Sequence, residues 1–584
     1  MKELKHINKY FYKYRYRLLF GVLITIFAKI FAVFTPRLIG KSITTISKGF
    51  NNEISNDVFK QELTTHIIYL IGAAIIAGFF TFLMRQTIIN VSRHIEYDLK
   101  NEVYQQYQRL SLNFYKSNRT GDLMNRISED VTKVRMYTGP AIMYTVNMVT
   151  LFVVALIYMI SVAPKLTLYT MLPLPFLSFI IYKLSKIINK RSTIVQQYLS
   201  KLSSYTQESF SGISIIKSYG IENENNLAFN ALSEESKQKQ IDLTKVQALF
   251  FPSMILLIGI SNILVAYVGG MQYINGEIKD IGTIAEFLFY VNMLTWPVAT
   301  VGWVTNLVQQ AEASQKRINE FLKQEPEIKN NTLEHTKIEG NIDFNNVTFI
   351  YPDTNIKALN QISFTLKKGE TLAVLGKTGS GKSTVLDLIG RLYDVQEGNI
   401  TIDGKTIDQL NLNDLRDSIG YVPQDAFLFS DTIENNIMFG KEDATEAEVI
   451  EAAKNAYVHK NIKKFTNGYK TKLGERGITL SGGQKQRISI ARALIKAPEI
   501  MLFDDCLSAV DTETEEKILN NLRKASQGKT TIIVSHRVSS AKHADKIIVL
   551  DEGKIVQSGT HENLINVDGY YQELYLKQLS SKEL

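Results

Sequence analysis

The chain has 584 residues, of which 45% are hydrophobic and 21% charged, so it is too long for one domain. Its net charge of +8 could indicate nucleic-acid binding, but the cations lie at the ends of apolar segments, as in membrane proteins. We therefore expect a membrane protein and no nucleic-acid partner. The single cysteine, Cys506, excludes a disulfide within one chain.

Six apolar segments in the first half of the chain are long enough, or nearly so, to cross a bilayer. They are 18–39, 65–90, 136–162, 166–188, 249–274 and 281–304. The basic stretch before the first segment resembles the start of a signal peptide, but the apolar run is span-length and no convincing cleavage site follows. We expect a retained span. The basic connections after the second and fourth spans, and both chain ends, are predicted to be cytoplasmic.

These two long connections are predicted to be helical hairpins that extend the spans beyond the bilayer. They contain few Pro or Gly residues, and Ile95, Leu99 and Val103 recur at helical spacing. The pattern breaks at two tips, near residues 114–123 and 210–219. The tips are either plain loops or docking elements for the second half of the chain, and their partly apolar sequence favours docking.

Ionisable residues inside the predicted spans need a partner or water, because each otherwise costs several kcal/mol. Lys29, midway along the first span, is a candidate for lining a polar central cavity, with an intramembrane ion pair as the alternative. Arg85 and Glu286 lie closer to span ends, where snorkelling explains them equally well. Three amides of the sixth span and the residues after it could face the same cavity: Asn292, Asn306 and Gln309.

The second half of the chain has the pattern of a soluble α/β domain. Short β-branched runs alternate with helical patterns, which predicts a mainly parallel sheet with helices on its faces. We expect a six-helix membrane domain with long cytoplasmic extensions over residues 1–317 and a charged linker over 318–336. An α/β nucleotide-binding domain is expected over 337–584.

The sequence from Gly376 to Ser383 directly follows an apolar run and matches the phosphate-binding loop G-x-x-x-x-G-K-[ST] at every position. Its glycines let successive N–H groups face a phosphate, Lys382 supplies positive charge, and the Ser383 hydroxyl can bind magnesium. A glycine-rich turn is the alternative, which the strand-loop-helix context disfavours. The residues assigned to the nucleotide here are Gly376, Thr378, Gly379, Ser380, Gly381, Lys382, Ser383 and Thr384.

Two further segments point to phosphate chemistry. Residues 500–504 read as a buried strand ending in Asp504, which suits a carboxylate that holds magnesium opposite Ser383. Ser481, Gly482, Gly483 and Gln484 open a helix and form a second potential anion site. If these two anion sites do not meet within one chain, two nucleotide domains must pair head to tail.

The segment 480–484 resembles the signature motif of ATP-binding cassette (ABC) proteins, and its combination with the phosphate loop is specific to that superfamily. The resemblance implies roles for Tyr351 in stacking on adenine, for Gln424 in sensing magnesium, and for His536 in contacting the γ-phosphate. It also places Asp511 in the loop that joins the two sites and Glu475 in an acidic patch near the docking helices.

Six spans fused ahead of a cassette resemble a half-transporter of the multidrug and lipid exporter type, whose coupling helices correspond to the two tips. The family normally has glutamate directly after the magnesium-site Asp, whereas this chain has Asp505. The shorter carboxylate is expected to polarise the attacking water poorly, since small misplacements can cost about a hundredfold. This departure resembles one subunit of the heterodimeric exporters. The alternative is that Asp505 still works as a slower base.

The resemblance therefore implies MgATP-driven export of amphipathic drugs or lipids across the cell membrane by a dimer, with weak hydrolysis at this chain's own site. The intact segment 481–484 would serve the partner's competent site. The alternatives are a regulatory subunit that binds ATP with little turnover, or a homodimeric lipid flippase or peptide exporter. The six spans disfavour a soluble cassette ATPase. The fusion of spans and cassette, with no sign of a binding-protein partner, disfavours an importer.

Overall fold

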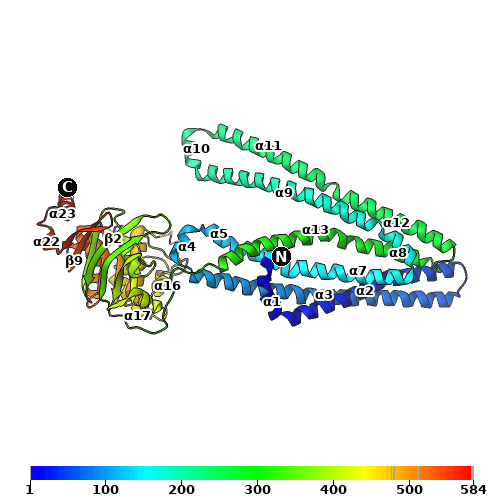
Figure 1. The fold of residues 1–584 in the computed structure, drawn as a ribbon, viewed down its shortest axis with the longest axis horizontal. Coiled ribbons are helices and arrows are strands. Elements are labelled where there is room, and N and C mark those ends of the chain that lie inside the picture. Colours follow the sequence, from blue (N-terminus) through cyan, green and yellow to red (C-terminus); the bar gives the residue numbers. More distant parts are fainter. Residues whose placement is uncertain (1, 475–476, 478–479, 509–511, 581–584) are drawn as a thin grey trace. The chain divides into compact units, whose positions relative to one another are not determined.

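The computed structural model describes residues 2–474, 477, 480–508 and 512–580, and it divides into two compact units (Figure 1). Unit 1 comprises residues 1–107 and 121–323 and is helical. Unit 2 comprises residues 324–584 together with the short segment 108–120. A piece of the first predicted tip therefore clusters with the nucleotide half of the chain.

Unit 1 is built from long helices joined by short connections. Its helices are η1 (Glu3–Ile7), α1 (Asn8–Lys13), α2 (Arg15–Phe50), α3 (Asn56–Arg109), α5 (Thr120–Asn125), η2 (Arg126–Asp130), α6 (Val131–Met136), η3 (Tyr137–Ala141), α7 (Ile142–Val162), α8 (Pro164–Met171), α9 (Pro173–Ser211), α10 (Ile213–Tyr219), α11 (Glu222–Gln247), α12 (Phe250–Ile274) and α13 (Gly282–Leu322). The predicted extension of the second span is continuous with it in α3, where Ile95, Leu99 and Val103 are fully buried.

Among the described residues, five helices are long and apolar enough to cross a membrane. They are Arg15–Phe50, Asn56–Arg109, Thr120–Val162, Glu222–Ile274 and Gly282–Leu322. The remaining predicted span, residues 166–188, is helical but is divided between α8 and α9 at Leu172, where Pro173 begins the next helix. The count of six spans therefore stays a prediction.

The N-terminal helix is fastened to α3 by its basic and aromatic side chains. Glu102 accepts hydrogen bonds from Lys9 Nζ and from the Tyr10 hydroxyl, each at 2.5 Å. One turn earlier on α3, Asp98 accepts from Lys13 Nζ at 2.7 Å and from the Tyr14 hydroxyl at 2.9 Å. Part of the N-terminal positive charge is thus neutralised within unit 1.

Helices α2 and α13 approach so closely at Gly40 and Gly282 that no side chain fits between them. A Cβ atom on Gly282 would lie 1.9 Å from the Gly40 carbonyl oxygen, and the Gly282 N–H donates to Thr44 Oγ1 at 3.2 Å. Small residues allow this kind of backbone approach between membrane helices. The adjoining Glu286 is 6% exposed, and its Oε1 lies 3.0 Å from the Tyr290 hydroxyl.

Substitution of Gly282 by valine is expected to destabilise unit 1 by about 3 kcal/mol or more, because overpacking forces α2 and α13 apart. The check is thermal unfolding of the purified chain in detergent. Gly78→Val in α3 is the matched control, since a Cβ at Gly78 meets nothing within 4 Å. Equal melting temperatures for the two variants would contradict the close-packing interpretation.

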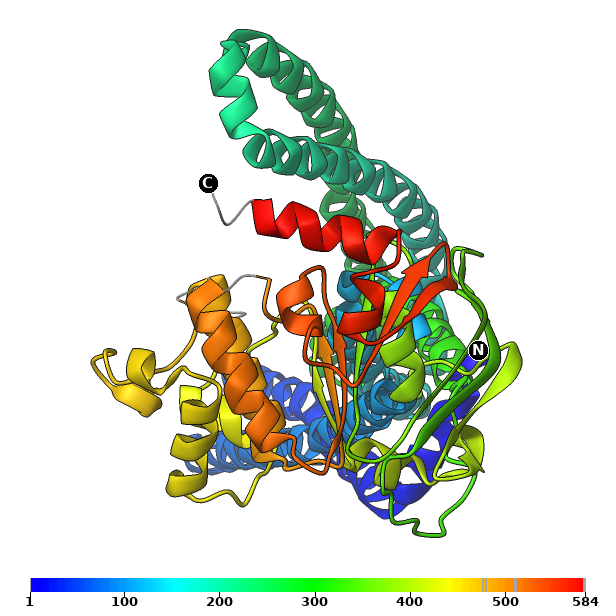
Figure 2. The same cartoon turned by 90° about the vertical axis from the view of Figure 1, so that its left-hand side faces the viewer.

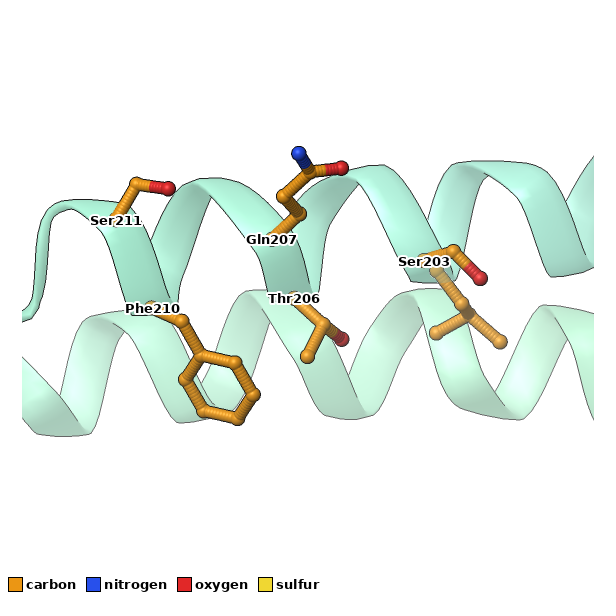
Figure 3. Close-up of a pocket in the computed structure, with 6 residues that line it drawn as sticks. Ser203, Thr206, Gln207, Phe210 and Ser211 are labelled. Atoms are coloured by element: carbon orange, nitrogen blue, oxygen red, sulfur yellow. The ribbon is translucent and has the colours of Figure 1, made fainter. Parts of the chain in front are cut away.

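The second tip, α10, presents apolar side chains to solvent. Ile215 is 60% exposed and Tyr219 is 78% exposed. The last turns of α9 before this tip carry an open groove, and Phe210, which lines it, is 71% exposed (Figure 3). An apolar tip of this kind is typical of a surface that contacts another protein.

Unit 2 contains two sheets. A four-stranded antiparallel sheet has the order β2-β1-β4-β5, and a six-stranded sheet has the order β10-β9-β3-β8-β7-β6, parallel except for β10. The strands are β1 (Ile342–Ile350), β2 (Lys357–Leu366), β3 (Thr371–Gly376), β4 (Glu397–Ile402), β5 (Lys405–Thr406), β6 (Ile419–Val422), β7 (Ile500–Asp504), β8 (Thr530–Val534), β9 (Lys546–Asp551) and β10 (Lys554–Gly559). The predicted mainly parallel sheet is confirmed, and the antiparallel sheet is an addition.

The helices of unit 2 surround three hydrophobic cores. They are α4 (Leu112–Ser117), α14 (Lys382–Ile389), α15 (Leu412–Asp417), α16 (Ile433–Met438), α17 (Glu446–Asn455), α18 (His459–Ile462), α19 (Gly482–Ile495), α20 (Thr512–Ala525), α21 (Val538–Ala541), α22 (His561–Leu564) and α23 (Tyr570–Ser580). The first core joins the antiparallel sheet, β3 and α14, the second joins α16 to α20, and a smaller third joins α21, α22 and α23 to β3 and β9. In Figure 2 the yellow and orange helices of the second core lie to the left of the strands.

Candidate nucleotide site

The phosphate loop runs from the end of β3 into α14, and its three glycines all have positive φ. Gly376 has φ +148° and Gly381 has φ +97°. A Cβ on Gly376 would lie 2.2 Å from the Leu550 carbonyl oxygen, and one on Gly381 would lie 2.3 Å from the Ala358 carbonyl oxygen. Both positions therefore exclude a side chain for reasons of backbone geometry and space.

Lys382, the first residue of α14, points back into this loop. Its Nζ donates to the carbonyl oxygens of Gly376 at 3.0 Å and Lys377 at 2.7 Å, and burial lowers its pKa. The neighbouring Ser380 hydroxyl is buried and has no hydrogen-bond partner within the described part of the chain. A buried cation beside an unpaired hydroxyl at a helix N-terminus fits a phosphate group.

Ser383 and Asp504 meet at the carboxyl ends of β3 and β7. The Ser383 hydroxyl donates to Asp504 Oδ1 at 2.9 Å. Asp504 is 5% exposed, and burial raises its pKa above the ordinary value. A carboxylate and a hydroxyl oxygen in contact are hard ligands of the kind that Mg²⁺ takes together with phosphates and water, so this donor set fits the ion.

Asp505 and His536 lie beside the same loop. The Asp505 backbone N–H donates to the Val534 carbonyl oxygen at 2.9 Å, which ties the end of β7 to the end of β8. The pKa of His536 is lowered by burial and by the Lys382 charge, and Asp505 and Asp504 oppose this shift. His536 is therefore neutral at pH 7, and one ring nitrogen can accept a hydrogen bond while the other donates.

Tyr351, a predicted nucleotide-binding residue, is in contact with α4 of the first tip. Its hydroxyl lies 2.9 Å from Thr384 Oγ1 on α14, and the ammonium of Lys116, from α4, lies 4.8 Å from its ring centroid. The same ammonium is 5.0 Å from the ring of Tyr393, which stands at 89° to that of Tyr351. Sequence reasoning missed Lys116 and Tyr393, because no motif connects residues so distant in the chain.

α4 is also tied to the beginning of unit 2. Asn113 Nδ2 donates to Glu327 Oε1 at 2.8 Å, and the Ile328 N–H donates to the Ser111 hydroxyl at 3.0 Å. These contacts hold α4 against the same unit as Tyr351. The first tip is thus in direct contact with a residue predicted to bind the nucleotide.

The second anion site lies on α19. Ser481 caps the helix: its hydroxyl accepts from the Gln484 N–H at 3.3 Å, and its own N–H donates to Gln484 Oε1 at 3.0 Å. Gln424 is exposed, and its carbonyl oxygen accepts from Gln486 Nε2 on α19 at 3.3 Å. α19 contributes to the second core, whereas α14 contributes to the first. Glu475 and Asp511 lie outside the described residues.

The candidate cavity residues of unit 1 fall in different environments. Asn306 lines a cavity between α9 and α13. Asn292 is exposed, and its amide donates to the Leu288 carbonyl oxygen of its own helix at 2.7 Å. Lys29 is half-buried on α2, and Glu286 is buried next to the contact between α2 and α13.

Together these features define a P-loop nucleotide-binding unit in one chain with a helical membrane unit. The model of the ABC transporter transmembrane region matches residues 18–298, and the ABC transporter model matches residues 359–508. The chain belongs to the ABC transporter family. Membership of this family confirms the predictions of a membrane protein and of an ATP hydrolase coupled to transport.

Individual relatives agree with this assignment. The chain is 39% identical to the probable multidrug resistance ABC transporter ATP-binding/permease protein YheI of Bacillus subtilis, over 80% of each chain. It is 38% identical to the multidrug resistance-like ATP-binding protein MdlA of Escherichia coli, over 81% of this chain and 80% of MdlA. Among solved structures, a bacterial Atm1-family ABC exporter with ATP bound is 26% identical, with a TM-score of 0.78 over 97% of this chain and 99% of that one. ABC exporters function as dimers.

Proposed function

We propose that this chain is one half of a dimeric exporter that uses MgATP to move amphipathic drugs or lipids out of the cell. The names of the multidrug relatives and the likeness to an exporter along 97% of the chain support this function. In this proposal residues 1–317 form six spans, 318–336 link them to the nucleotide-binding domain at 337–584, and both ends are cytoplasmic. Its test is ATP-dependent uptake of a fluorescent amphiphile into inverted membrane vesicles.

At the nucleotide site, we assign the phosphates to the loop N–H groups, Lys382 and Ser380. Ser383 and Asp504 would hold magnesium, and Gln424 would lie near the ion. When bound, the ion would neutralise phosphate charge. Tyr351 would stack on the adenine. His536, neutral at pH 7, would position the γ-phosphate by a hydrogen bond.

The composite arrangement of the dimer rests on the separation of the two anion surfaces. The phosphate loop adjoins the first core of unit 2, and the N-terminus of α19 is exposed on the second. We therefore propose that Ser481, Gly482, Gly483 and Gln484 complete the nucleotide site of a second subunit, with Asp511 in the loop between the sites. Because each composite site takes half of its residues from each chain, the two sites of a heterodimer can differ.

Asp505 is the single observation that favours a heterodimer with a weak site on this chain. Its side chain is one methylene shorter than that of the usual glutamate, and the residue is buried, with 8% of its surface exposed. The full chain, purified alone, is accordingly expected to bind ATP and hydrolyse it slowly. Turnover of several ATP per second, within the usual enzyme range, would refute the weak-site proposal.

A regulatory subunit is the second candidate, and Asp505 favours it as well. Such a subunit would keep ATP bound while the partner's site turns over. Nucleotide trapping separates the two functions: a regulatory subunit retains unhydrolysed ATP through many transport cycles, whereas a slow catalytic subunit accumulates ADP. A homodimeric flippase or peptide exporter predicts equal ADP in both sites.

Coupling between nucleotide and membrane is proposed to pass through the two tips. Lys116 on α4 contacts Tyr351 of its own chain, and the exposed apolar side chains of α10 suit docking to the nucleotide-binding domain of the second subunit.

Lys116→Ala is expected to lower substrate-stimulated ATP hydrolysis about 3- to 10-fold, because it removes cation–π contacts worth about 1 kcal/mol. Lys116→Arg is the matched control, since a guanidinium also binds aromatic faces. Stimulated and basal hydrolysis are measured in proteoliposomes at saturating ATP. Equal stimulation in Lys116→Ala and the unmodified chain would show that the contact carries no coupling.

A further inference from the structure

We propose that the cavity between α9 and α13 binds amphiphiles with an acidic headgroup, such as a carboxylate, sulfate or phosphate on an apolar body. This inference rests on the proposed export function and specifies its substrate class. The cavity has a volume of about 380 Å³ and takes its walls from both helices. That volume falls in the range of sites for small organic molecules.

The two helices are in contact where they border this space. A Cβ on Gly302 of α13 would lie 3.0 Å from the Ser185 hydroxyl of α9, and both residues line the cavity. Beyond this contact α9 leads toward α10 and diverges from α13 (Figure 1). The predicted fourth and sixth spans end near residues 188 and 304, so the cavity lies at their cytoplasmic ends. It is therefore open to molecules that arrive from the cytoplasm or the inner leaflet.

The charges of the two helices around the cavity are of one sign. α9 has no acidic residue before Glu208, and α13 has none between Glu286 and Glu312. Between residues 183 and 191, α9 carries Lys183, Lys186, Lys190 and Arg191, and α11, which packs against α9, has Asp242 next to Arg191. Near a protein surface the effective dielectric constant is about 20, well below that of water, so a positive charge on this wall attracts anions more strongly than it would in bulk water.

Among the described residues that line the cavity, Lys186 carries the positive charge. Of its neighbours on α9, Lys183 has its ammonium 4.8 Å from the ring of Phe179, and Arg191 donates to the Asp242 carbonyl oxygen. Lys186 forms no ion pair with any of the residues that the structure describes. Its ammonium therefore has donors available for a ligand.

The remaining lining completes a site for an acidic amphiphile. The amides of Asn189, Asn306 and Gln309 can donate to the headgroup oxygens, and Ile181 and Val301 present apolar surface to the body of the ligand. A cationic amphiphile would meet Lys186, and none of the lining residues that the structure describes is a carboxylate that could offset the repulsion. The site therefore discriminates by the sign of the headgroup charge.

The transport test uses two xanthene dyes of opposite charge, carboxyfluorescein and rhodamine 123. The vesicles are inverted membranes from cells that produce the full chain with whatever subunit copurifies with it. We expect ATP-dependent uptake of carboxyfluorescein, and Lys186→Gln should lower it at least tenfold while leaving any rhodamine uptake intact. Lys183→Gln, one turn away on the same helix, is the matched control and should keep full uptake. Preferential uptake of rhodamine 123, or equal effects of both substitutions, would overturn the proposal.

A second measurement needs neither ATP nor transport. Both tryptophans of the chain are in α13, and Trp303 follows Gly302 directly. We expect saturable quenching of tryptophan fluorescence by dodecanoate, at least tenfold weaker affinity for dodecyltrimethylammonium, and loss of the difference in Lys186→Gln. Equal affinities for the two detergents would overturn the inference. If no dye is transported but dodecanoate still binds selectively, the export function fails and the anion site stands.

The source of the ligand is tested with two labelled lipids. Fluorescent phosphatidylglycerol and phosphatidylcholine share acyl chains and differ in headgroup charge. ATP-dependent movement of phosphatidylglycerol alone assigns the site to anionic lipids, and transport of carboxyfluorescein without either lipid assigns it to soluble acidic amphiphiles. Both results support an anion-selective site. Preferential movement of phosphatidylcholine contradicts it.

Discussion

Restoring glutamate at position 505 is expected to raise the ATP turnover of the purified chain by about 10- to 100-fold. Asp505 lies directly after β7, and its charge affects both Lys382 and His536. These two neighbouring groups of the site are therefore already present. The Asp505 side chain is one methylene shorter than glutamate, so its carboxylate does not extend as far toward the attacking water. The measurement is steady-state phosphate release by Asp505→Glu and by the unmodified chain at equal protein concentration.

Two controls accompany this variant. Asp505→Asn should fall below the unmodified chain if Asp505 acts as a slow base, and it should equal the unmodified chain if ATP is only held. Asp505 has φ +38°, a region that Asp tolerates better than most residues, so the melting temperature of Asp505→Glu must be compared as well. A correctly folded Asp505→Glu variant with no gain in turnover would contradict the assignment of this position to the chemistry.

Gly483→Asp in the signature segment is expected to lower ATP turnover of the two-subunit transporter by about 100-fold or more. Gly483 lies in the first turn of α19, where N–H groups and the helix dipole face a phosphate. A carboxylate at that point repels the phosphate and competes for the same donors. The loss falls on the partner's site, which the proposal identifies as the faster one.

Lys382→Ala is the informative comparison for this prediction. It disables the phosphate loop of this chain, whose site is proposed to be weak, so the loss of turnover should be at least tenfold smaller than in Gly483→Asp. Both variants are measured by phosphate release and by binding of a fluorescent ATP analogue. Equal losses would indicate two equivalent sites and would favour a homodimer.

The nucleotide site was largely predictable from the sequence because its chemistry is local. A glycine pattern constrains the backbone over eight consecutive residues, and the buried strand before it is a continuous apolar run. Asp504 could be paired with Ser383 because parallel strands bring their carboxyl ends to one edge, and the structure has them 2.9 Å apart. By contrast, the antiparallel sheet of β1, β2, β4 and β5 was missed. β1 pairs with β2, and β4 with β5, as neighbours in the chain, but the β1–β4 pairing that joins them into one sheet connects separated segments.

Taken alone, the sequence determined the ABC family, the phosphate loop, the main parallel strands and the long helices of the membrane half. Each of these features depends on consecutive residues or on apolar residues at helical spacing. Tertiary structure decided which distant side chains meet. It joined Lys116 to Tyr351, paired the basic N-terminus with Asp98 and Glu102, and placed Lys186 and Asn306 in the lining of one cavity. Such contacts join segments that are more than eighty residues apart in the chain. They cannot be predicted from a local pattern of charge or hydrophobicity.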